Sequence, residues 1–353
     1  MLSIRTRLEE RRGRARDAAL KAQADELVSE HRSREAIDLL DAAVHEHSAP
    51  DLEAHLLRVR HAAFADRERR PGPAEWPPTA PDCFGIPGGT LPEVGPDDLS
   101  ATVIRSAIVN HGGLLVRGML ASDRVERLVD GIDRAFAAHD AFYAGAPSTE
   151  TLPWYLPFEG PFGKSIDMIR PFMRKGGGVL TVESPRAARE VIDTFSALGL
   201  IDMIGEHLGE RPALSAKKWT LRKVPTTSNT NWHQDGAFLG PVVRSVNVWV
   251  TLSDCGVDAP GLDVVPRRVD EILPTGTEGA IFDWSIGEAV VARAAAGAPV
   301  VRPVLQAGDA LVFDDRFVHR TAVDEQMHRE RYAIESWFFA PSKYPMPQLP
   351  VML

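Results

Sequence analysis

The chain has 353 residues and a formal net charge of −9, with 44% hydrophobic and 25% charged residues. This composition is that of an ordinary globular protein with one large domain or two modest ones, and the negative charge argues against a general nucleic-acid-binding protein. No apolar run reaches the roughly 18 residues needed to span a bilayer, and no apolar segment typical of a secretory signal occurs near the N-terminus. Only two cysteines occur, Cys83 and Cys255, so we expect a cytoplasmic protein without a disulfide framework.

The first 70 residues are expected to be helical. Apolar residues recur at helical spacing around Leu20 and again around Leu40, and breaks near Ser33 and Pro50 divide the segment into three helices. The pattern resembles a single tetratricopeptide-like hairpin, and one such unit cannot form a solenoid because about three are needed. Two interpretations remain open: an arm that packs on the rest of the chain or on a second subunit of a homodimer, or a dedicated partner-binding module.

Prolines crowd residues 71–95. Such spacing forbids a regular helix and favours an extended segment lying on a surface, so we predict a connector here. The chain would then consist of an N-terminal helical arm (residues 1–70), this proline-rich connector, and a main domain (residues 96–353).

The first part of the main domain is predicted to be helical. Helices are expected near Leu99–Asn110, from a cap at Ser122 and Asp123 to about Phe142, and from Pro185 onward, with Ser184 as the cap of the last one. Residues 143–178 are rich in aromatic residues, glycine and proline, which predicts a long irregular segment. Such a segment is either a lid over a binding site or a satellite hydrophobic cluster.

After about residue 209 the hydrophobic pattern changes from a helical period to alternation. Strands are predicted at 214–223, 245–253, 261–265, 300–304, 310–314, 318–323 and 331–339. Helices followed by many short strands with glycine turns indicate an α+β protein whose β core is a closed or double sheet, and a jelly roll fits this pattern best.

Three residues have the chemistry of a metal site. His233 and Asp235 lie two positions apart, so on an extended strand their side chains point to the same side. His319 supplies a second imidazole further along the chain. Two histidines and one carboxylate that bind one face of an ion and leave the opposite face open form the facial triad of non-haem Fe(II) oxygenases.

Arg331 opens the alternating strand that follows His319. Its planar, permanently charged guanidinium is suited to binding a carboxylate, such as the distal end of 2-oxoglutarate. Arg329 lies at a similar distance from His319 but in a polar turn, where it would lose more conformational entropy on clamping a diacid. We therefore predict that Arg331 rather than Arg329 is the clamp.

Trp249 lies on the predicted strand 245–253, one face of which is mostly polar while the other is apolar. A polar face inside a small β core indicates a lined cleft, whereas the ordinary role of a tryptophan on a strand is in the core. Glu335 and Trp337 share the parity of Arg331 and could reach the same cleft.

Together these segments resemble the phytanoyl-CoA dioxygenase family of iron- and 2-oxoglutarate-dependent oxygenases, over roughly residues 96 to 342. The matching motifs occur in the family's order: His111–Gly118, His233–Gly236, Val246–Asp254, Ala259–Pro266, Gly308–Asp314, His319–Thr321 and Arg331–Trp337. The resemblance implies a double-stranded β-helix core of the jelly-roll or cupin-like type with flanking helices. It also implies the use of Fe(II), 2-oxoglutarate as cosubstrate, and O2.

The resemblance implies roles for individual residues as well. The iron ligands, and with them the catalytic centre, would be His233, Asp235 and His319. The contacts to 2-oxoglutarate would be the distal-carboxylate partner Arg331, the hydroxyl of Thr321, and Trp249 beside the cosubstrate.

The expected activity is hydroxylation of an unactivated C–H bond in a small molecule (a lipid, an amino acid or a natural product) with release of succinate and CO2. Asp235 argues against a halogenase, in which a small residue replaces the carboxylate, while desaturation and epimerisation stay open. Two alternatives are another metal-dependent cupin-like enzyme, either an isomerase or a hydrolase, and a non-catalytic binding protein that uses the helical arm.

The chain departs from the family at residues 266–269, which read Pro-Arg-Arg-Val where the family usually continues Pro-Gly-Ser-His near the substrate. The two arginines, Arg267 and Arg268, either meet an anionic substrate or are solvated, and we predict solvated surface charge. His111 and His207 have no ligand-like partners at suitable spacing, so we expect them at the surface or as helix caps.

Overall fold

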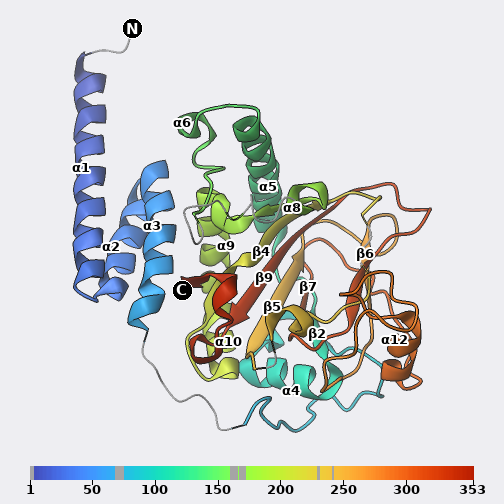
Figure 1. Ribbon diagram of the computed structural model, residues 1–353. Coiled ribbons are helices and arrows are strands. Elements are labelled where there is room, and N and C mark those ends of the chain that lie inside the picture. Colours follow the sequence, from blue (N-terminus) through green and yellow to red (C-terminus); the bar gives the residue numbers. More distant parts are fainter. Residues whose placement is uncertain (1–3, 68–74, 160–165, 167–171, 229–230, 241) are drawn as a thin grey trace.

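The computed structural model describes residues 4–67, 75–159, 166, 172–228, 231–240 and 242–353 (Figure 1). The α-helices are α1 (Ile4–Ser29), α2 (Ser33–Glu46), α3 (Pro50–Ala62), α4 (Ala101–His111), α5 (Ser122–Tyr143), α6 (Ser148–Thr151), α8 (Phe172–Lys175), α9 (Pro185–Ala197), α10 (Leu200–Leu208), α11 (Gly236–Leu239) and α12 (Glu288–Ala295). The strands are β1 (Glu93–Val94), β2 (Gly113–Val116), β3 (Gly178–Leu180), β4 (Ala213–Val224), β5 (Ser245–Thr251), β6 (Gly261–Val264), β7 (Ala310–Phe313), β8 (His319–Ala322), β9 (Arg331–Phe339) and β10 (Pro350–Met352). No helix among the described residues is long and apolar enough to cross a membrane.

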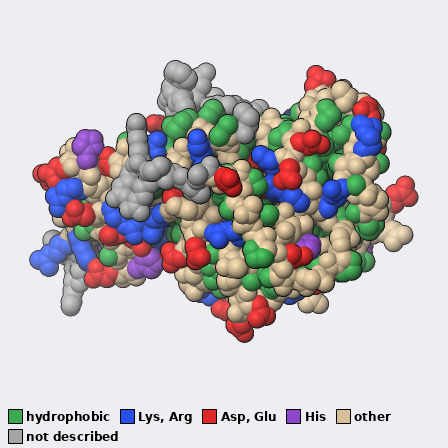
Figure 2. All heavy atoms as spheres, turned by 90° about the horizontal axis from the view of Figure 1, so that it is seen from below, with side chains coloured by type: hydrophobic (Ala, Val, Ile, Leu, Met, Phe, Trp, Pro, Cys, Tyr) green, Lys and Arg blue, Asp and Glu red, His purple; other side chains and the backbone are tan. Residues whose placement is uncertain are grey.

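Helices α1, α2 and α3 form an arm on one side of the molecule (Figure 1). They share a small hydrophobic cluster that includes Ala24, Leu40 and Leu52. On the face seen in Figure 2 the arm projects at the left and carries basic and acidic side chains side by side. Exposed ion pairs such as Arg16–Glu46 belong to this surface.

The arm contacts the main domain through α3. The buried Glu53 carboxylate accepts hydrogen bonds from Arg186 at 2.7 Å and Arg189 at 3.2 Å, both on α9. Arg60 donates to the carbonyl oxygen of Met352 at 3.1 Å. Helix α3 therefore packs against both α9 and β10. These contacts agree with the interpretation of an arm packed on its own chain.

A large sheet lies at the centre of the molecule (Figure 1). Its strand order is β1-β2-β7-β5-β9-β4-β10, and β3 also pairs with β4. Strand β1 is parallel to β2, whereas the other pairs are antiparallel. Because β1 comprises Glu93–Val94, the predicted connector ends inside the sheet rather than before it.

A second, antiparallel sheet consists of β6 and β8. Isolated backbone bridges extend it, with His233 beside His319 of β8 and Val301 beside Val264 of β6. The sequence predicted a full strand at 300–304, but the structure has only the single bridge at Val301. The prolines and glycines that surround Val301 do not support a longer ladder.

The alternation along β5 divides the large sheet into two faces. Val246, Val248 and Val250 belong to a hydrophobic cluster with residues of α4, α5, α9 and α10, which cover this face. Asn247 and Trp249 face the other way and line a cavity. The chain thus has mixed helix and sheet content, as predicted, with the polar strand face turned away from the covering helices.

Helix α9 begins at Pro185 with Ser184 at its N-cap position, as expected. The hydroxyl of Ser184 is buried without a hydrogen-bond partner among the described residues, so the cap makes no side-chain hydrogen bond. The predicted irregular segment 143–178 contains α6, α8 and the start of β3, while residues 160–165 and 167–171 lie outside the described part. Phe172 and Met173 of α8 line the cavity.

Candidate active site

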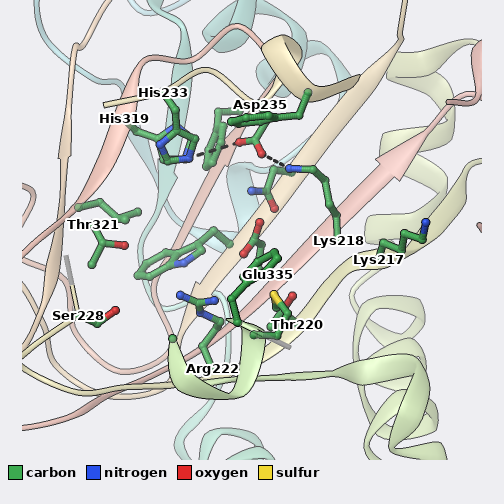
Figure 3. A pocket seen from close by; sticks show the side chains of 18 of the residues that line it. Lys217, Lys218, Thr220, Arg222, Ser228, His233, Asp235, His319, Thr321 and Glu335 are labelled. Carbon is green, nitrogen blue, oxygen red and sulfur yellow. Dashed lines mark hydrogen bonds and ion pairs between the residues drawn. The ribbon is translucent and has the colours of Figure 1, made fainter. Parts of the chain in front are cut away.

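The cavity has a volume of about 780 Å³ and lies between the two sheets. One wall comes from the large sheet, through β4, β5, β7 and β9, and the opposite wall from the small sheet, through β6 and β8. Figure 3 shows how side chains from these strands converge on one space. Its size is within the range of roughly 300–1,000 Å³ that is usual for small-molecule sites.

His233, Asp235 and His319 lie together at one end of this cavity (Figure 3). The backbone of His233 pairs with that of His319 through N–H···O bonds of 3.0 and 3.1 Å. This bridge sets the two rings side by side with centroids 4.4 Å apart. Ligand atoms from the three residues all lie within 4.8 Å of one another, which fits a single metal ion.

Backbone carbonyls orient both imidazole rings. The Nδ1 atom of His233 is 2.8 Å from the carbonyl oxygen of Asn231, and that of His319 is 3.0 Å from the carbonyl oxygen of Phe317. A proton on Nδ1 makes these hydrogen bonds and leaves Nε2 with a free lone pair for a metal. Burial and the neighbouring His233 lower the pKa of His319 to about 4, so its ring is neutral at pH 7.

Gln234 lies between the two predicted ligands His233 and Asp235 and holds this segment in place. Its buried amide nitrogen donates to the carbonyl oxygens of Glu271 at 3.0 Å and Arg316 at 2.6 Å. Its amide oxygen accepts from the N–H of Leu273 at 2.8 Å. With these bonds Gln234 points away from the cavity and ties the metal-site segment to two loops, a role that the sequence did not reveal.

Asp235 is paired with Lys218 of β4 (Figure 3). The lysine ammonium contacts Oδ1, while Oδ2 lies 3.7 Å from Nε2 of His319. Burial opposes the negative charge, but Lys218 and the two imidazoles outweigh it and lower the carboxyl pKa to about 2. Asp235 is therefore a carboxylate with one oxygen on a lysine and the other directed at the histidines.

Arg331 is 1% exposed and lines the same cavity. Its Nη1 atom donates to the carbonyl oxygens of Pro260 and Gly261 at 3.1 and 2.9 Å, and its guanidinium carbon lies 5.1 Å from the centre of the Trp249 ring. Burial lowers its pKa to about 10, which still leaves it charged at pH 7. Its Nε–H has no hydrogen-bond partner among the described residues, and a bound carboxylate would satisfy it.

The remaining predicted residues are divided between the cavity and its surroundings. Thr321, Trp249 and Glu335 line the cavity, and Trp249 stands opposite Glu335 in the sheet register. Trp337 is fully buried, and its indole N–H donates to Glu335 at 3.0 Å. Arg329 lies in an exposed turn and pairs with Asp258, away from the cavity.

Residues 108–323 match the phytanoyl-CoA dioxygenase family. The chain belongs to this family. Phytanoyl-CoA dioxygenases and their relatives use Fe(II), 2-oxoglutarate and O2, and the donor set of two imidazoles and one carboxylate suits Fe(II). The chain is thus an iron- and 2-oxoglutarate-dependent oxygenase, as the sequence predicted.

Several solved structures are similar to this member of the phytanoyl-CoA dioxygenase family. The non-haem α-ketoglutarate-dependent carbocyclase SnoK from nogalamycin biosynthesis is 14% identical, with 70% of this chain and 86% of that chain covered and a TM-score of 0.45. AviO1 from Streptomyces viridochromogenes Tue57 is 21% identical, with 67% and 93% covered and a TM-score of 0.43. EctD from S. alaskensis, solved with 2-oxoglutarate and 5-hydroxyectoine, is 16% identical, with 66% and 73% covered and a TM-score of 0.45. No curated protein matches the chain.

The segment that departs from the family has a structural role. Arg268 was predicted to be solvated, but its side chain is only 8% exposed. It pairs with Asp314 at 2.5 Å and with Asp270 at 2.8 Å. Arg268 does not line the cavity. It joins its loop to the residues that follow β7, so it is neither solvated nor directed at a substrate.

The two other histidines are also buried, contrary to the prediction. His111 is 5% exposed, and its Nε2 lies 3.0 Å from Asp82 of the connector. His207 is 2% exposed, and neither of its ring nitrogens has a hydrogen-bond partner among the described residues. Both contribute to packing, since their rings make edge contacts with Phe84 and Trp76 respectively.

Proposed function

We propose that this oxygenase hydroxylates an unactivated C–H bond of a small organic molecule, with release of succinate and CO2. One observation carries the proposal: His233, Asp235 and His319 converge within 4.8 Å at one end of a cavity that also contains the buried guanidinium of Arg331. A metal site beside a buried cation is the arrangement that an iron ion and a chelating keto diacid require.

Each residue has a definite task in this proposal. His233, Asp235 and His319 would hold iron from one side, so that the opposite side stays open to the cavity. Bound iron supplies the activation of O2 for oxidation of the keto acid and of the substrate C–H bond. Arg331 would orient 2-oxoglutarate through its distal carboxylate.

Thr321 and Trp249 would complete this binding site. Thr321 would contribute a hydroxyl contact, and the ring of Trp249 would form a wall beside the cosubstrate. Because Arg331 is already held by two carbonyl oxygens, little entropy is lost when the diacid binds. The buried walls of the cavity also exclude water from the oxidising centre.

We further propose that the two sheets form a double-stranded β-helix. The antiparallel strands β2, β7, β5, β9 and β4 make one layer, and β8 and β6, extended by the bridges at His233 and Val301, make the facing layer. In this arrangement the cavity is the interior of a jelly roll, with the metal site at one of its ends.

The test is an anaerobic titration with Fe(II) and then 2-oxoglutarate. We expect a metal-to-ligand charge-transfer band in the visible spectrum, which only a keto acid chelated to Fe(II) produces. His319→Ala should abolish the band because it removes a ligand, whereas His328→Ala, which changes an exposed histidine, should leave it intact.

Two results would contradict the proposal. A full band in His319→Ala would exclude the predicted triad. Absence of the band in the unaltered protein, together with activity supported by Zn²⁺ or Mn²⁺, would favour a cupin-like isomerase or hydrolase. Under air, release of succinate on addition of a candidate substrate then measures turnover.

A further inference from the structure

Strand β4 departs from regular pairing where it borders the cavity. Its register with β9 shifts between Leu214 and Trp219. Within the shift, the N–H of Lys218 donates to the hydroxyl of Ser215 at 3.0 Å. Neighbouring residues of a regular strand point to opposite faces, yet Lys217 and Lys218 both line the cavity. Bulges beside active sites commonly redirect side chains in this way.

Lys218 is a cation at the predicted metal site (Figure 3). Its ammonium contacts Asp235 and lies 5.6 Å from the ring centre of Phe238 and 5.5 Å from that of Trp337. Its side chain is 13% exposed. Bound iron would use the same Asp235 carboxylate as a ligand. Lys218 would then share this carboxylate with a dication, so that it can accept a second anion.

The charges around the cavity favour that second anion. The described lining residues include four cations, Lys217, Lys218, Arg222 and Arg331, and two carboxylates, Asp235 and Glu335. Iron and 2-oxoglutarate carry opposite double charges, so together they leave the excess of positive charge unchanged. The excess persists even when Lys217, which points away from the triad in Figure 3, is set aside. A partly buried positive charge is costly unless an anion joins it.

Aromatic rings lie close to Lys218. Phe238, Phe282 and Trp284, which we call the aromatic shelf, are exposed to 45%, 51% and 39%. The Phe282 and Trp284 rings stack at 5.5 Å, and Phe238 lies 6.0 Å from Trp284. The Trp284 ring is also 6.3 Å from that of the predicted ligand His233. Clustered exposed rings beside a site favour a ligand with an apolar, flat body.

We propose that Lys218 and the aromatic shelf bind the prime substrate, an organic anion with a carboxylate or phosphate head group on a ring-bearing apolar body. This inference rests on the proposed function, since it places the substrate beside iron-bound 2-oxoglutarate. Lys218 contacts the predicted ligand Asp235 and also lies beside Phe238 of the shelf. A substrate held by both therefore presents its C–H bonds to the open side of the metal site.

The test compares three molecules that share one ring system: 1-naphthylacetate, 1-naphthyl phosphate and the neutral 2-(1-naphthyl)ethanol. Each is titrated calorimetrically into the protein loaded with Fe(II) and 2-oxoglutarate under anaerobic conditions. We expect at least one anion to bind about tenfold or more tightly than the alcohol, as for a charge-assisted contact in a partly buried site. The tighter of the two anions identifies the head group.

Substitutions of Lys218 and of a residue of the aromatic shelf test whether these side chains bind the substrate. Lys218→Met should remove the preference for the anions, whereas Lys343→Met, which changes an exposed lysine away from the cavity, should preserve it. Trp284→Ala should weaken the binding of all three molecules, because all three contain the same naphthyl ring system. The charge-transfer band, recorded for every variant, shows that iron and 2-oxoglutarate are loaded.

Equal affinity for the anions and the alcohol, binding of none of the three, or an unchanged preference in Lys218→Met would overturn the inference. Its failure differs from failure of the proposed function. If the band forms in the unaltered protein but the anions are not preferred, only the substrate inference is wrong. If the band does not form at all, the proposed function itself is wrong.

Discussion

Arg331 and Arg329 are near neighbours in sequence but differ in their surroundings. Arg331 is buried, held by two carbonyl oxygens and packed beside Trp249, whereas Arg329 is exposed in a turn. We expect Arg331→Gln to weaken 2-oxoglutarate binding by roughly 30- to 1000-fold, since a bidentate charged pair contributes about 2–4 kcal/mol. Arg329→Gln should change it by less than about threefold. Titration of the charge-transfer band measures both, and the reverse ranking would refute the assignment.

His207 predicts a specific pH dependence of stability. Burial, followed by the nearby Arg105 and Arg268, lowers its pKa to about 3 from 6.5. When the pH falls below about 6.5, His207 becomes protonated in the unfolded chain. In the folded chain it stays neutral down to about pH 3. The free energy of unfolding should therefore decrease over this window, by up to about 1.4 kcal/mol per pH unit from this group.

Urea unfolding at about pH 7.5 and about pH 5 measures the effect. His207→Gln removes the titrating group, so its free energy of unfolding should fall less between these two values. His328→Gln, which changes an exposed histidine, should behave like the unaltered protein. If His207→Gln keeps the full pH dependence, other groups cause it.

At the residue scale, sequence reasoning succeeded where chemistry and spacing are local. The two-residue spacing suggests the pair His233 and Asp235, and the resemblance to the family adds His319. The structure brings the three residues together, and their role as metal ligands stays a prediction. Arg268 was misjudged because its partner Asp314 is distant in sequence. Lys218 was missed because its partner Asp235 lies outside its strand and 17 residues along the chain, although Lys218 shares the parity of the cavity-lining Thr220 and Arg222.

At the scale of elements, the turn from Asp235 into α11 depends on Gly236. Its N–H donates to the carbonyl oxygen of Asp315 at 2.8 Å. A Cβ atom there would lie 2.4 Å from Cδ1 of Ile272, 2.7 Å from Oδ2 of Asp315 and 3.0 Å from the Asp315 carbonyl oxygen. The Ile272 methyl can move aside, but the backbone oxygen is fixed by the loop that leads to β8.

We expect Gly236→Ala to displace Asp235 and to weaken Fe(II) binding by about tenfold or more, as for changes in the residues that support metal ligands. Gly88→Ala is the matched control, because no atom lies within 4 Å of its added Cβ. Fe(II) titration of both variants provides the measurement. Equal affinities would show that the turn tolerates the methyl group.

The helices were easier to predict than the strands. Helix α5 has apolar residues at helical spacing over many turns, and it ends within one residue of the predicted position. The strand expected at 300–304 is only a single bridge at Val301 in the structure. A strand forms when its backbone pairs with a neighbouring strand, and the local sequence does not show which strand that is. The large sheet's order, with β7 between β2 and β5, likewise depends on long-range pairing.

At the scale of the whole molecule, we expect the arm to contribute stability rather than chemistry. None of the described residues of α1–α3 lines the cavity, but Glu53 of α3 is buried between Arg186 and Arg189. We expect deletion of residues 1–70 to lower Tm by at least about 6 °C, because Leu57 and Phe64 belong to the hydrophobic clusters of the main domain and each contributes roughly 1.5–3 kcal/mol by its burial. Iron and 2-oxoglutarate should still bind.

Deletion of residues 1–15 is the control, because the shared cluster of the arm begins only at Leu20. Scanning calorimetry and the charge-transfer titration report the two properties separately. An unchanged Tm after deletion of 1–70 would mean that the docking contacts contribute nothing. Loss of 2-oxoglutarate binding in a folded truncated protein would place the arm in the catalytic unit.

The contact between α3 and β10 has a consequence for the order of folding. His61 of α3 lies 2.6 Å from the carbonyl oxygen of Pro350, so this contact joins segments almost a whole chain length apart. Closing so long a loop is entropically costly and slow, whereas α2 and α3 can pair locally. The arm should therefore form early as a helical hairpin but dock only after β10 has joined β4. In pulse-labelled hydrogen exchange, amides of β10 should gain protection later than those of α2, and the opposite order would contradict this sequence of events.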